Sequence, residues 1–279
     1  MEAACLNNMT DLDILRKQWV QNRDPETQIH MWNQSAPNYE KKEIPSLSED
    51  DFLHLIAQQV NLNREMKCLD IGCGAGIYSL ALAPYVHSVL GVDISPEMIA
   101  ACNRKAAAAE YGNAAFSCVN WDTLDLKKDG FYHCFDLVFA RMTPAICDYD
   151  SFEKMVNCSR WYGFLESNIK RQDVGMDHAL SLIHIRSDEK PQDEKLNNCR
   201  LYLELHGIRS QVFYRQEIWK PVRTVENAIS WCLDRAKLSR PITDEDRTII
   251  RNHFESIAED GMIRDTVHTT IATLFWEMQ

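Results

Sequence analysis

Residues 68–76 form the glycine-rich segment CLDIGCGAG, in which an apolar run ends at Asp70 and glycines follow at positions 72, 74 and 76. Glycine adopts positive φ without strain and lets the backbone approach a ligand closely. A turn of this kind between a first strand and a helix is where an α/β sheet accepts a nucleotide. The segment therefore predicts an α/β fold with a ligand site at the carboxyl edge of the sheet.

The spacing of these glycines separates two classes of nucleotide site. Dinucleotide-binding turns use GxGxxG, in which the helix N-terminus faces a pyrophosphate. This chain has GxGxG, and Asp70 stands two residues before the first glycine. A carboxylate so close would repel a pyrophosphate, whereas it would attract a ligand with an ammonium or sulfonium charge. A glycine turn that binds no ligand remains the alternative for this segment taken alone.

Two further acids follow at the ends of the next predicted strands. Asp93 ends the strand SVLGVD, where a carboxylate can accept both hydroxyls of a ribose, although it could also be a helix-cap acid. Asp122 follows the third strand, where an acid can accept from an adenine amino group and the face of Trp121 can cover the ring. Three acids in order after three successive strands favour a nucleoside site over separate structural roles.

Strand and helix patterns alternate after residue 66, which is typical of a parallel sheet covered on both faces. The expected strands are 66–71, 88–93, 114–120, 135–140, 161–166, 209–219 and 266–278. The expected helices are 77–83, 95–112, 197–208, 224–236 and 243–258. The second of these helices begins at Ser95-Pro96-Glu97, which combines a cap, a first-turn proline and an acid near the positive helix end.

The N-terminal part contains two further helical patterns. After Thr10 as a cap, leucines and a tryptophan recur at helical spacing, and a second helix with Ser48 as its cap covers residues 49–60. Between them, we expect residues 29–45 to be irregular, because this aromatic stretch is bounded by Pro37 and Pro45.

Charge and cysteine usage limit the partners. The net charge of −11 opposes binding to nucleic acid or to an anionic membrane. No CxxC pair or zinc-like Cys/His spacing is found, so no metal is expected. No basic segment followed by an apolar stretch opens the chain, and no apolar run approaches 18 residues. We therefore expect a cytoplasmic protein that does not enter a membrane.

The organisation expected from these patterns is a single domain. Its parts are an N-terminal helical lid at 1–60, a cofactor-binding core at 61–170, and a C-terminal part of the sheet at 171–279 with a helical cap at about 224–260. The segment 186–195 is expected to be a charge-rich surface loop. Trp219 and Trp231 flank the cap, and core packing is favoured for both over a role in covering an apolar pocket.

The segments CLDIGCGAG, GVDISPEM, NWDTLDL and FDLVFA resemble the successive motifs of class I S-adenosylmethionine-dependent methyltransferases, specifically over residues 66–166. The small-molecule branch of the ubiquinone- and menaquinone-biosynthesis type is the most similar. The resemblance implies a doubly wound, mostly parallel seven-stranded sheet in the order 3-2-1-4-5-7-6, with strand seven antiparallel. It also implies S-adenosylmethionine as the cofactor and S-adenosylhomocysteine as the product.

The same resemblance implies roles for individual residues around the cofactor. Asp70, Gly72 and Gly74 would line its methionine part, with Cys73 between the glycines, and Asp93 would hold the ribose hydroxyls.

At the adenine end of the cofactor, Ile94 would pack on the ring and Asp122 would meet its amino group. Trp121 or its neighbours would lie beside the ring, and Met98 is included in the site.

Three residues outside these motifs complete the implied site. The segment HMWNQSAPNY resembles the N-terminal lid of the family, in which Trp32 or Tyr39 would close over the cofactor. Hydrophobic anchoring of the N-terminal arm is the alternative for these aromatics. Arg141, just past the fourth strand, would lie near the sulfonium and the substrate entrance, where it either fixes a substrate carboxylate or phosphate or pairs with a neighbouring acid.

The acceptor is constrained only indirectly. After the fourth strand the chain reads ARMTPAICDYD, unlike the Asn/Asp-Pro-Pro-aromatic pattern of enzymes that methylate amino groups of adenine, cytosine or glutamine. Together with the acidic charge, this favours in-line methyl transfer to a small molecule, with no catalytic residue assigned. Alternatives are a cofactor-binding protein, transfer of another group, and a macromolecule methyltransferase. For Asp148, Tyr149 and Asp150, an exposed helix cap is favoured over facing a cationic or phenolic acceptor.

Overall fold

The computed structural model describes residues 10–21, 23–185, 193–237 and 239–278, and the chain divides into two compact units. The first unit contains Met1–Ser167, Glu194–Phe213 and Thr273–Gln279. The second contains Asn168–Asp193 and Tyr214–Ala272. Most of the segment 186–195, expected to be a surface loop, lies outside the described residues. The single-domain organisation expected from the sequence stays a prediction.

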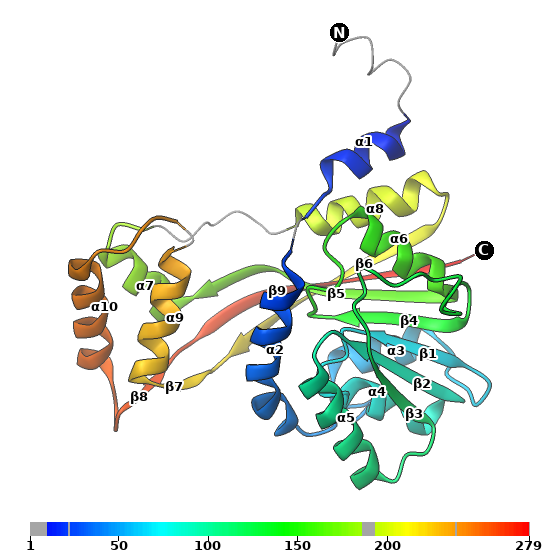
Figure 1. Cartoon of the computed structure of the whole chain (residues 1–279), viewed down its shortest axis with the longest axis horizontal. Helices are drawn as coiled ribbons and strands as arrows, with labels where there is room; N and C mark the ends of the chain where they lie inside the picture. The colour runs from blue at the N-terminus through cyan, green and yellow to red at the C-terminus, as the bar shows by residue number, and fades with distance from the viewer. Residues whose placement is uncertain (1–9, 22, 186–192, 238, 279) are drawn as a thin grey trace. The chain divides into compact units, whose positions relative to one another are not determined.

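A seven-stranded sheet has the order β3-β2-β1-β4-β5-β9-β6, which confirms the strand order that the resemblance implied (Figure 1). The pairings that join β3 to β2, β2 to β1, β1 to β4 and β4 to β5 are all parallel. The strands are β1 (Lys67–Ile71), β2 (Ser88–Asp93), β3 (Ala114–Cys118), β4 (Phe135–Arg141), β5 (Ser159–Asp173), β6 (Arg209–Trp219) and β9 (Val267–Glu277).

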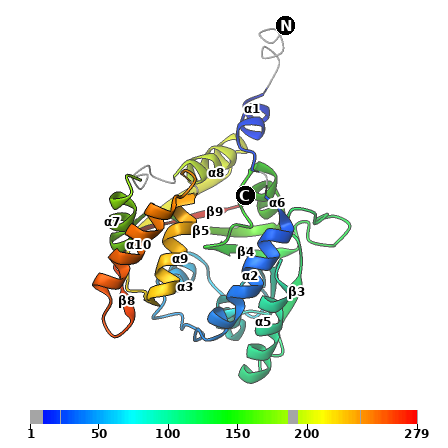
Figure 2. The ribbon, with the colours of Figure 1, turned by 60° about the vertical axis from the view of Figure 1, so that its left-hand side comes forward.

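Helices flank the strands of the first unit, and α2 lies alongside α5 in both ribbon views (Figures 1 and 2). The first-unit helices are α1 (Asp11–Gln18), α2 (Pro25–Glu40), α3 (Asp51–Gln59), α4 (Ile77–Leu82), a 3-10 helix (Ala83–Tyr85), α5 (Pro96–Ala109), α6 (Tyr149–Cys158) and α8 (Glu194–Leu205). The predicted caps of three helices are confirmed, since the side chains of Thr10, Ser95 and Asp148 accept from Asp13 N, Met98 N and Ser151 N.

The core of the first unit lies where α3 covers β1, β4 and β5. Phe52 of α3 is fully buried, and its ring centroid lies 6.1 Å from that of Phe139 and 6.3 Å from that of Phe164. Aromatic pairs at such separations add to the free energy gained from burial. This packing holds the carboxyl ends of the central strands in fixed positions beneath the loops that follow them.

The expectation that residues 29–45 are irregular is wrong for residues 29–40, which belong to α2. Asp24 caps this helix by accepting from Thr27 N at 2.9 Å, and Pro25 occupies the first turn. Tertiary packing on α5 offsets the cost of Pro37 in the last turn. Arg104 of α5 pairs with Glu40 at 2.7 Å, and Ser95 donates to Asn33 at 2.7 Å.

The cap expected at Ser48 is also wrong. The N-cap of α3 is Asp50, whose Oδ1 accepts from Phe52 N and Leu53 N at 3.0 Å each. Ser48 instead hydrogen-bonds to Ser46. A carboxylate satisfies two of the free N–H groups at once and favours the positive helix end more than a hydroxyl does.

Among the described residues, the second unit contains three helices and a short two-stranded antiparallel sheet (Figures 1 and 2). These elements are α7 (Val174–Leu182), α9 (Val225–Lys237), α10 (Asp244–Ile257), β7 (Val222–Thr224) and β8 (Met262–Arg264). The antiparallel β7–β8 pair was not anticipated, because three-residue strands carry too little pattern to detect. No helix among the described residues is long and apolar enough to cross a membrane.

Candidate cofactor site

The glycine turn joins β1 to α4, and all three of its glycines have positive φ: 69° at Gly72, 55° at Gly74 and 73° at Gly76. A Cβ added to Gly72 would lie 2.0 Å from Oγ1 of Thr143, and one added to Gly74 would lie 3.5 Å from the ring of Tyr39. Glycine at position 72 therefore satisfies both the backbone conformation and the close approach of the loop after β4. At position 74 only the positive φ requires glycine, because 3.5 Å is an ordinary contact distance.

Asp70 is the penultimate residue of β1, beneath this turn, and is buried, with 3% of its surface exposed. Ser79 Oγ donates to its Oδ2 at 2.6 Å. Burial raises the pKa of Asp70 to about 7, because the carboxylate loses its hydration. A positive charge nearby would favour the ionised form, which is consistent with the role expected from the sequence.

Asp93 connects the glycine turn to the start of α5. Its Oδ2 accepts from Gly74 N and its Oδ1 accepts from Ser95 N, both at 2.9 Å. Burial raises the pKa of this carboxyl as well. Each carboxylate oxygen retains capacity for a further donor, so the residue can hold the turn and also accept hydroxyl groups.

The two apolar residues predicted near the adenine differ in exposure. Ile94 is half-buried, whereas Met98 is buried in the first unit with 1% exposure. Met98 also takes part in the cap of α5 through its backbone N–H. The contact of either side chain with a cofactor stays a prediction.

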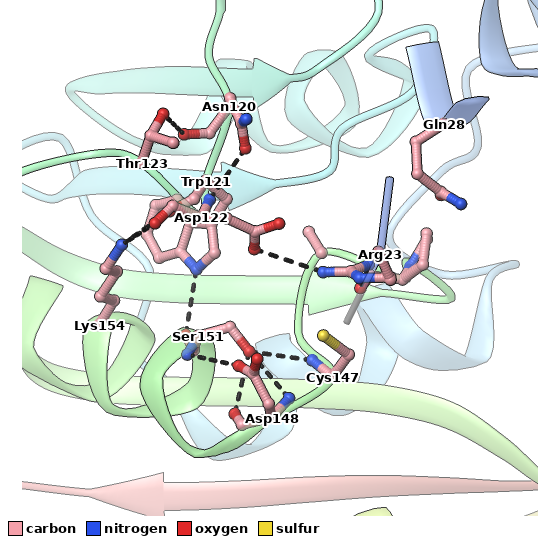
Figure 3. Close-up of polar contacts among 12 residues, drawn as sticks. Arg23, Gln28, Asn120, Trp121, Asp122, Thr123, Cys147, Asp148, Ser151 and Lys154 are labelled. Carbon is pink, nitrogen blue, oxygen red and sulfur yellow. Dashed lines mark hydrogen bonds and ion pairs between the residues drawn. The ribbon is translucent and has the colours of Figure 1, made fainter. Parts of the chain in front are cut away.

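The loop after β3 is held by helix α6 (Figure 3). The indole N–H of Trp121 donates to Ser151 O at 3.0 Å, and Trp121 is buried, with 4% of its surface exposed. Lys154 Nζ donates to the carbonyl oxygens of Trp121 at 3.1 Å and Asp122 at 2.7 Å. Trp121 therefore anchors this loop, and its place beside an adenine stays a prediction.

Arg23 is a residue of this site that the sequence did not single out. Its guanidinium pairs with Oδ1 of Asp122 at 3.4 Å and donates to Pro144 O (Figure 3). The Arg23 side chain is 15% exposed, whereas that of Asp122 is 42% exposed. Arg23 thus connects the segment between α1 and α2 to the loops after β3 and β4. Nothing in its local sequence distinguishes it from a surface arginine.

Arg141 pairs with a neighbouring acid, which is the second of the two roles that the sequence left open. Its Nε lies 2.8 Å from Oε1 of Glu166, which is fully buried on β5. The guanidinium carbon also lies 4.4 Å from the ring centroid of Tyr78. This arrangement fixes Arg141 as the partner of a buried acid, and its contact with a cofactor or substrate stays a prediction.

The predicted lid aromatics lie on α2. The rings of Trp32 and Tyr39 meet edge to face, with centroids 6.2 Å apart, and Lys42 Nζ lies 4.0 Å from the Tyr39 ring centroid. The Trp32 indole donates to Gln28 Oε1 at 3.3 Å. Burial is the main cause of the raised pKa of Tyr39, and the charge of Asp93 adds to it. Tyr39 therefore lies beside both the glycine turn and Asp93.

Cys73 lies within the turn, where its Sγ is 4.0 Å from Sγ of Cys102. Cys102 Sγ donates to Gly74 O at 3.0 Å, so these thiols pack beneath the turn. Burial raises the pKa of Cys73, which keeps it as a neutral thiol. Across the described residues, His, Cys, Asp and Glu side chains form no group of three or more that could hold a metal ion.

Comparisons with known proteins agree with this geometry. A family model for a methyltransferase domain matches residues 62–202, about half of the chain. An uncharacterized methyltransferase of Bacillus subtilis, YcgJ, is 30% identical over 100 residues, which cover 36% of this chain and 39% of the relative. A 23S rRNA uracil methyltransferase of Photobacterium angustum is 31% identical over 87 residues, covering 30% of this chain and 40% of the relative.

The chain thus aligns with about two fifths of the length of these relatives. The crystal structure of the Bacillus YcgJ protein has a similar fold, with a TM-score of 0.52 at 17% identity, and covers 81% of this chain and 97% of that protein. With the matched family model and the observed strand order, these findings show that the chain belongs to the class I S-adenosylmethionine-dependent methyltransferase family.

Proposed function

We propose that this protein transfers a methyl group from S-adenosylmethionine directly to a small-molecule acceptor. The observation that carries the proposal is the junction of β1 and β2. There a turn of positive-φ glycines is tied by Gly74 N to the carboxylate of Asp93, above the buried carboxyl of Asp70. This combination suits a nucleoside that also bears positive charge, and it does not suit a pyrophosphate.

The residues present fit the cofactor. Asp70 would offset its ammonium or sulfonium charge, Asp93 would accept the ribose hydroxyls, and Asp122 would accept from the adenine amino group. Tyr39 would cover the site from α2. When bound, S-adenosylmethionine supplies an activated methyl group. The protein's own contribution is orientation and exclusion of water, which for well-aligned groups lowers a barrier by roughly 7–11 kcal/mol.

A small-molecule acceptor is favoured by the net charge of −11, which opposes binding to nucleic acid. The loop after β4 also lacks the Pro-Pro-aromatic pattern of amino-group methyltransferases, since Thr143 and Pro144 occupy this position. An RNA acceptor is the second candidate, because one relative is an rRNA methyltransferase. A protein that only binds the cofactor would transfer no label from methyl-labelled S-adenosylmethionine to any acceptor.

The cofactor assignment is tested with Asp93→Ala. Loss of this carboxylate leaves ribose hydroxyls and two backbone N–H groups without a partner, so we expect S-adenosylhomocysteine to bind more weakly by about 1–3 kcal/mol. Isothermal titration calorimetry measures the change. The exposed acid Asp150, replaced in the same way, is the control and should leave the affinity as it is. Unchanged affinity in a folded Asp93→Ala protein would exclude the ribose role.

A further inference from the structure

The second unit contains an alternating series of tryptophan and arginine side chains. The guanidinium carbon of Arg171, on β5, lies 5.6 Å from the ring centroid of Trp219 and 5.1 Å from that of Trp231. The guanidinium carbon of Arg223, on β7, lies 4.0 Å from the centroid of the same Trp231 ring. Two cations therefore meet one indole, which lies on α9.

Most hydrogen-bonding groups around this series already have partners. Arg171 Nη2 donates to Asp173 Oδ2 at 3.2 Å, and the Trp219 indole donates to Glu217 at 2.6 Å. Asp265 Oδ1 accepts from Gly175 N at 2.8 Å and from Thr266 N at 2.7 Å. One oxygen of each of these aspartates is thus engaged with other groups, whereas Oδ1 of Asp173 is buried without a hydrogen-bond partner among the described residues.

Arg223 is the exception. Among the residues that the structure describes, its guanidinium makes no hydrogen bond and no ion pair; it lies over the face of Trp231 and interacts with the charges of Asp173 and Asp265 without a direct contact. The side chain is half-buried, and burial lowers its pKa, an effect that the charges of Asp173 and Asp265 offset only in part and that the charge of Arg171 reinforces. A ring face attracts a cation but cannot replace the hydrogen bonds of five N–H groups.

A ligand that satisfies Arg223 must carry a planar, negatively charged acceptor, because the guanidinium fork matches a carboxylate in two parallel hydrogen bonds. A flat ring attached to that carboxylate would lie against the half-buried indoles of Trp219 and Trp231. We propose that Arg223, together with Arg171 and Trp231, forms a binding site for a small aromatic carboxylate in the second unit. This site does not depend on methyl transfer, and it is defined entirely by residues of the second unit.

The test uses the full-length protein without cofactor, with benzoate as the probe and benzamide as its uncharged analogue. We expect benzoate to bind saturably in calorimetry and to shift the indole N–H resonance of Trp231, which is assigned by its loss in Trp231→Phe. Because Arg223→Gln removes a charge-assisted bidentate contact, it should weaken benzoate binding by roughly 10- to 100-fold.

Two further variants make the result specific. Arg223→Lys keeps the charge but loses the fork, so it should also weaken binding at least about tenfold. Arg251→Gln removes a solvent-exposed arginine of the same unit and should change affinity less than about twofold. Benzoate affinity that is the same in wild type, Arg223→Gln and Arg223→Lys would overturn the site. Equal competition by benzamide or by inorganic phosphate would overturn the aromatic carboxylate as its ligand.

Discussion

At Gly72, the absence of a side chain lets the glycine turn pack directly against the loop after β4. The residue has a φ of 69°, and a Cβ there would overlap Oγ1 and Cβ of Thr143, at 2.0 and 2.7 Å. The first glycine of the turn is therefore required by a neighbouring protein loop as well as by its backbone conformation. A sequence pattern cannot distinguish these two causes, because both select glycine.

We expect Gly72→Ala to destabilise the protein more than Gly130→Ala. Gly130 also has positive φ, at 77°, but a Cβ there would meet nothing within 4 Å. The conformational cost shared by both is about 1–2 kcal/mol, and the overlap at Gly72 should add about 1–3 kcal/mol. Urea unfolding measures the difference. Adding Thr143→Gly to Gly72→Ala should recover the second part. Equal losses in the two glycine variants would show that the overlap relaxes freely.

Asp70 should make both stability and cofactor binding depend on pH. Burial raises its pKa to about 7 from an ordinary value near 3.8. Between these values the folded protein keeps a proton that the unfolded chain releases, so this carboxyl lowers the free energy of unfolding as pH rises through that range. Replacement by Asn should flatten this decline, which thermal unfolding between pH 5 and 7.5 can follow.

The binding of S-adenosylmethionine should change with pH in the opposite direction. A cation near Asp70 favours the carboxylate, so binding should release a proton and become tighter as pH rises from about 6 to 7.5. Calorimetry in buffers of different ionisation enthalpy measures the released proton. Asp70→Asn is the matched variant, and the same proton release in it would assign the effect to another group.

At the scale of elements, helix α2 is unusual because it contains a proline, Pro37, in its last turn. Proline there removes the hydrogen bond to the carbonyl of Asn33 and opposes the helix. Contacts with α5, such as Arg104–Glu40, compensate for it. The helix that carries Trp32 and Tyr39 is thus stabilised by its packing more than by its own sequence.

Pro37→Ala should therefore stabilise α2. Alanine is about 3 kcal/mol more favourable than proline inside a helix, and a gain of about 2 kcal/mol is expected after the greater freedom of the unfolded chain, about 0.4–1 kcal/mol, is subtracted. Hydrogen exchange of the α2 amides should slow accordingly. Pro25→Ala provides the control, since proline in the first turn carries no such cost. Faster exchange in Pro37→Ala would show that proline stabilises the helix end.

At the scale of the molecule, the charge of −11 bears on the acceptor. An acidic protein gains little from the counterion release that drives binding to RNA. We expect methyl-labelled S-adenosylmethionine to transfer label to the small-molecule fraction of a cell extract and not to purified rRNA. Scintillation counting of the separated fractions measures both. Label in rRNA that disappears after ribonuclease treatment would favour the second candidate acceptor.

Local sequence determined much of this protein. The alternation of strands and helices, the caps at Thr10, Ser95 and Asp148 and the glycine turn at 72–76 were all readable, because each depends on residues within a few positions of one another. The strand order followed from the resemblance of the motifs to a known family. The helix at α2 was missed because its stability depends on α5, more than fifty residues further along the chain.

The tertiary structure alone decided which groups meet. Arg23 reaching Asp122, Arg141 pairing with buried Glu166, and Arg223 stacking on Trp231 all join residues from separate elements. Charge and aromatic character are visible at each position, but the partner is chosen by the path of the backbone and by burial. The sequence by itself thus indicated the fold and the methyltransferase family. The pairing of its charged side chains, which decides the ligands that they can accept, required the folded chain.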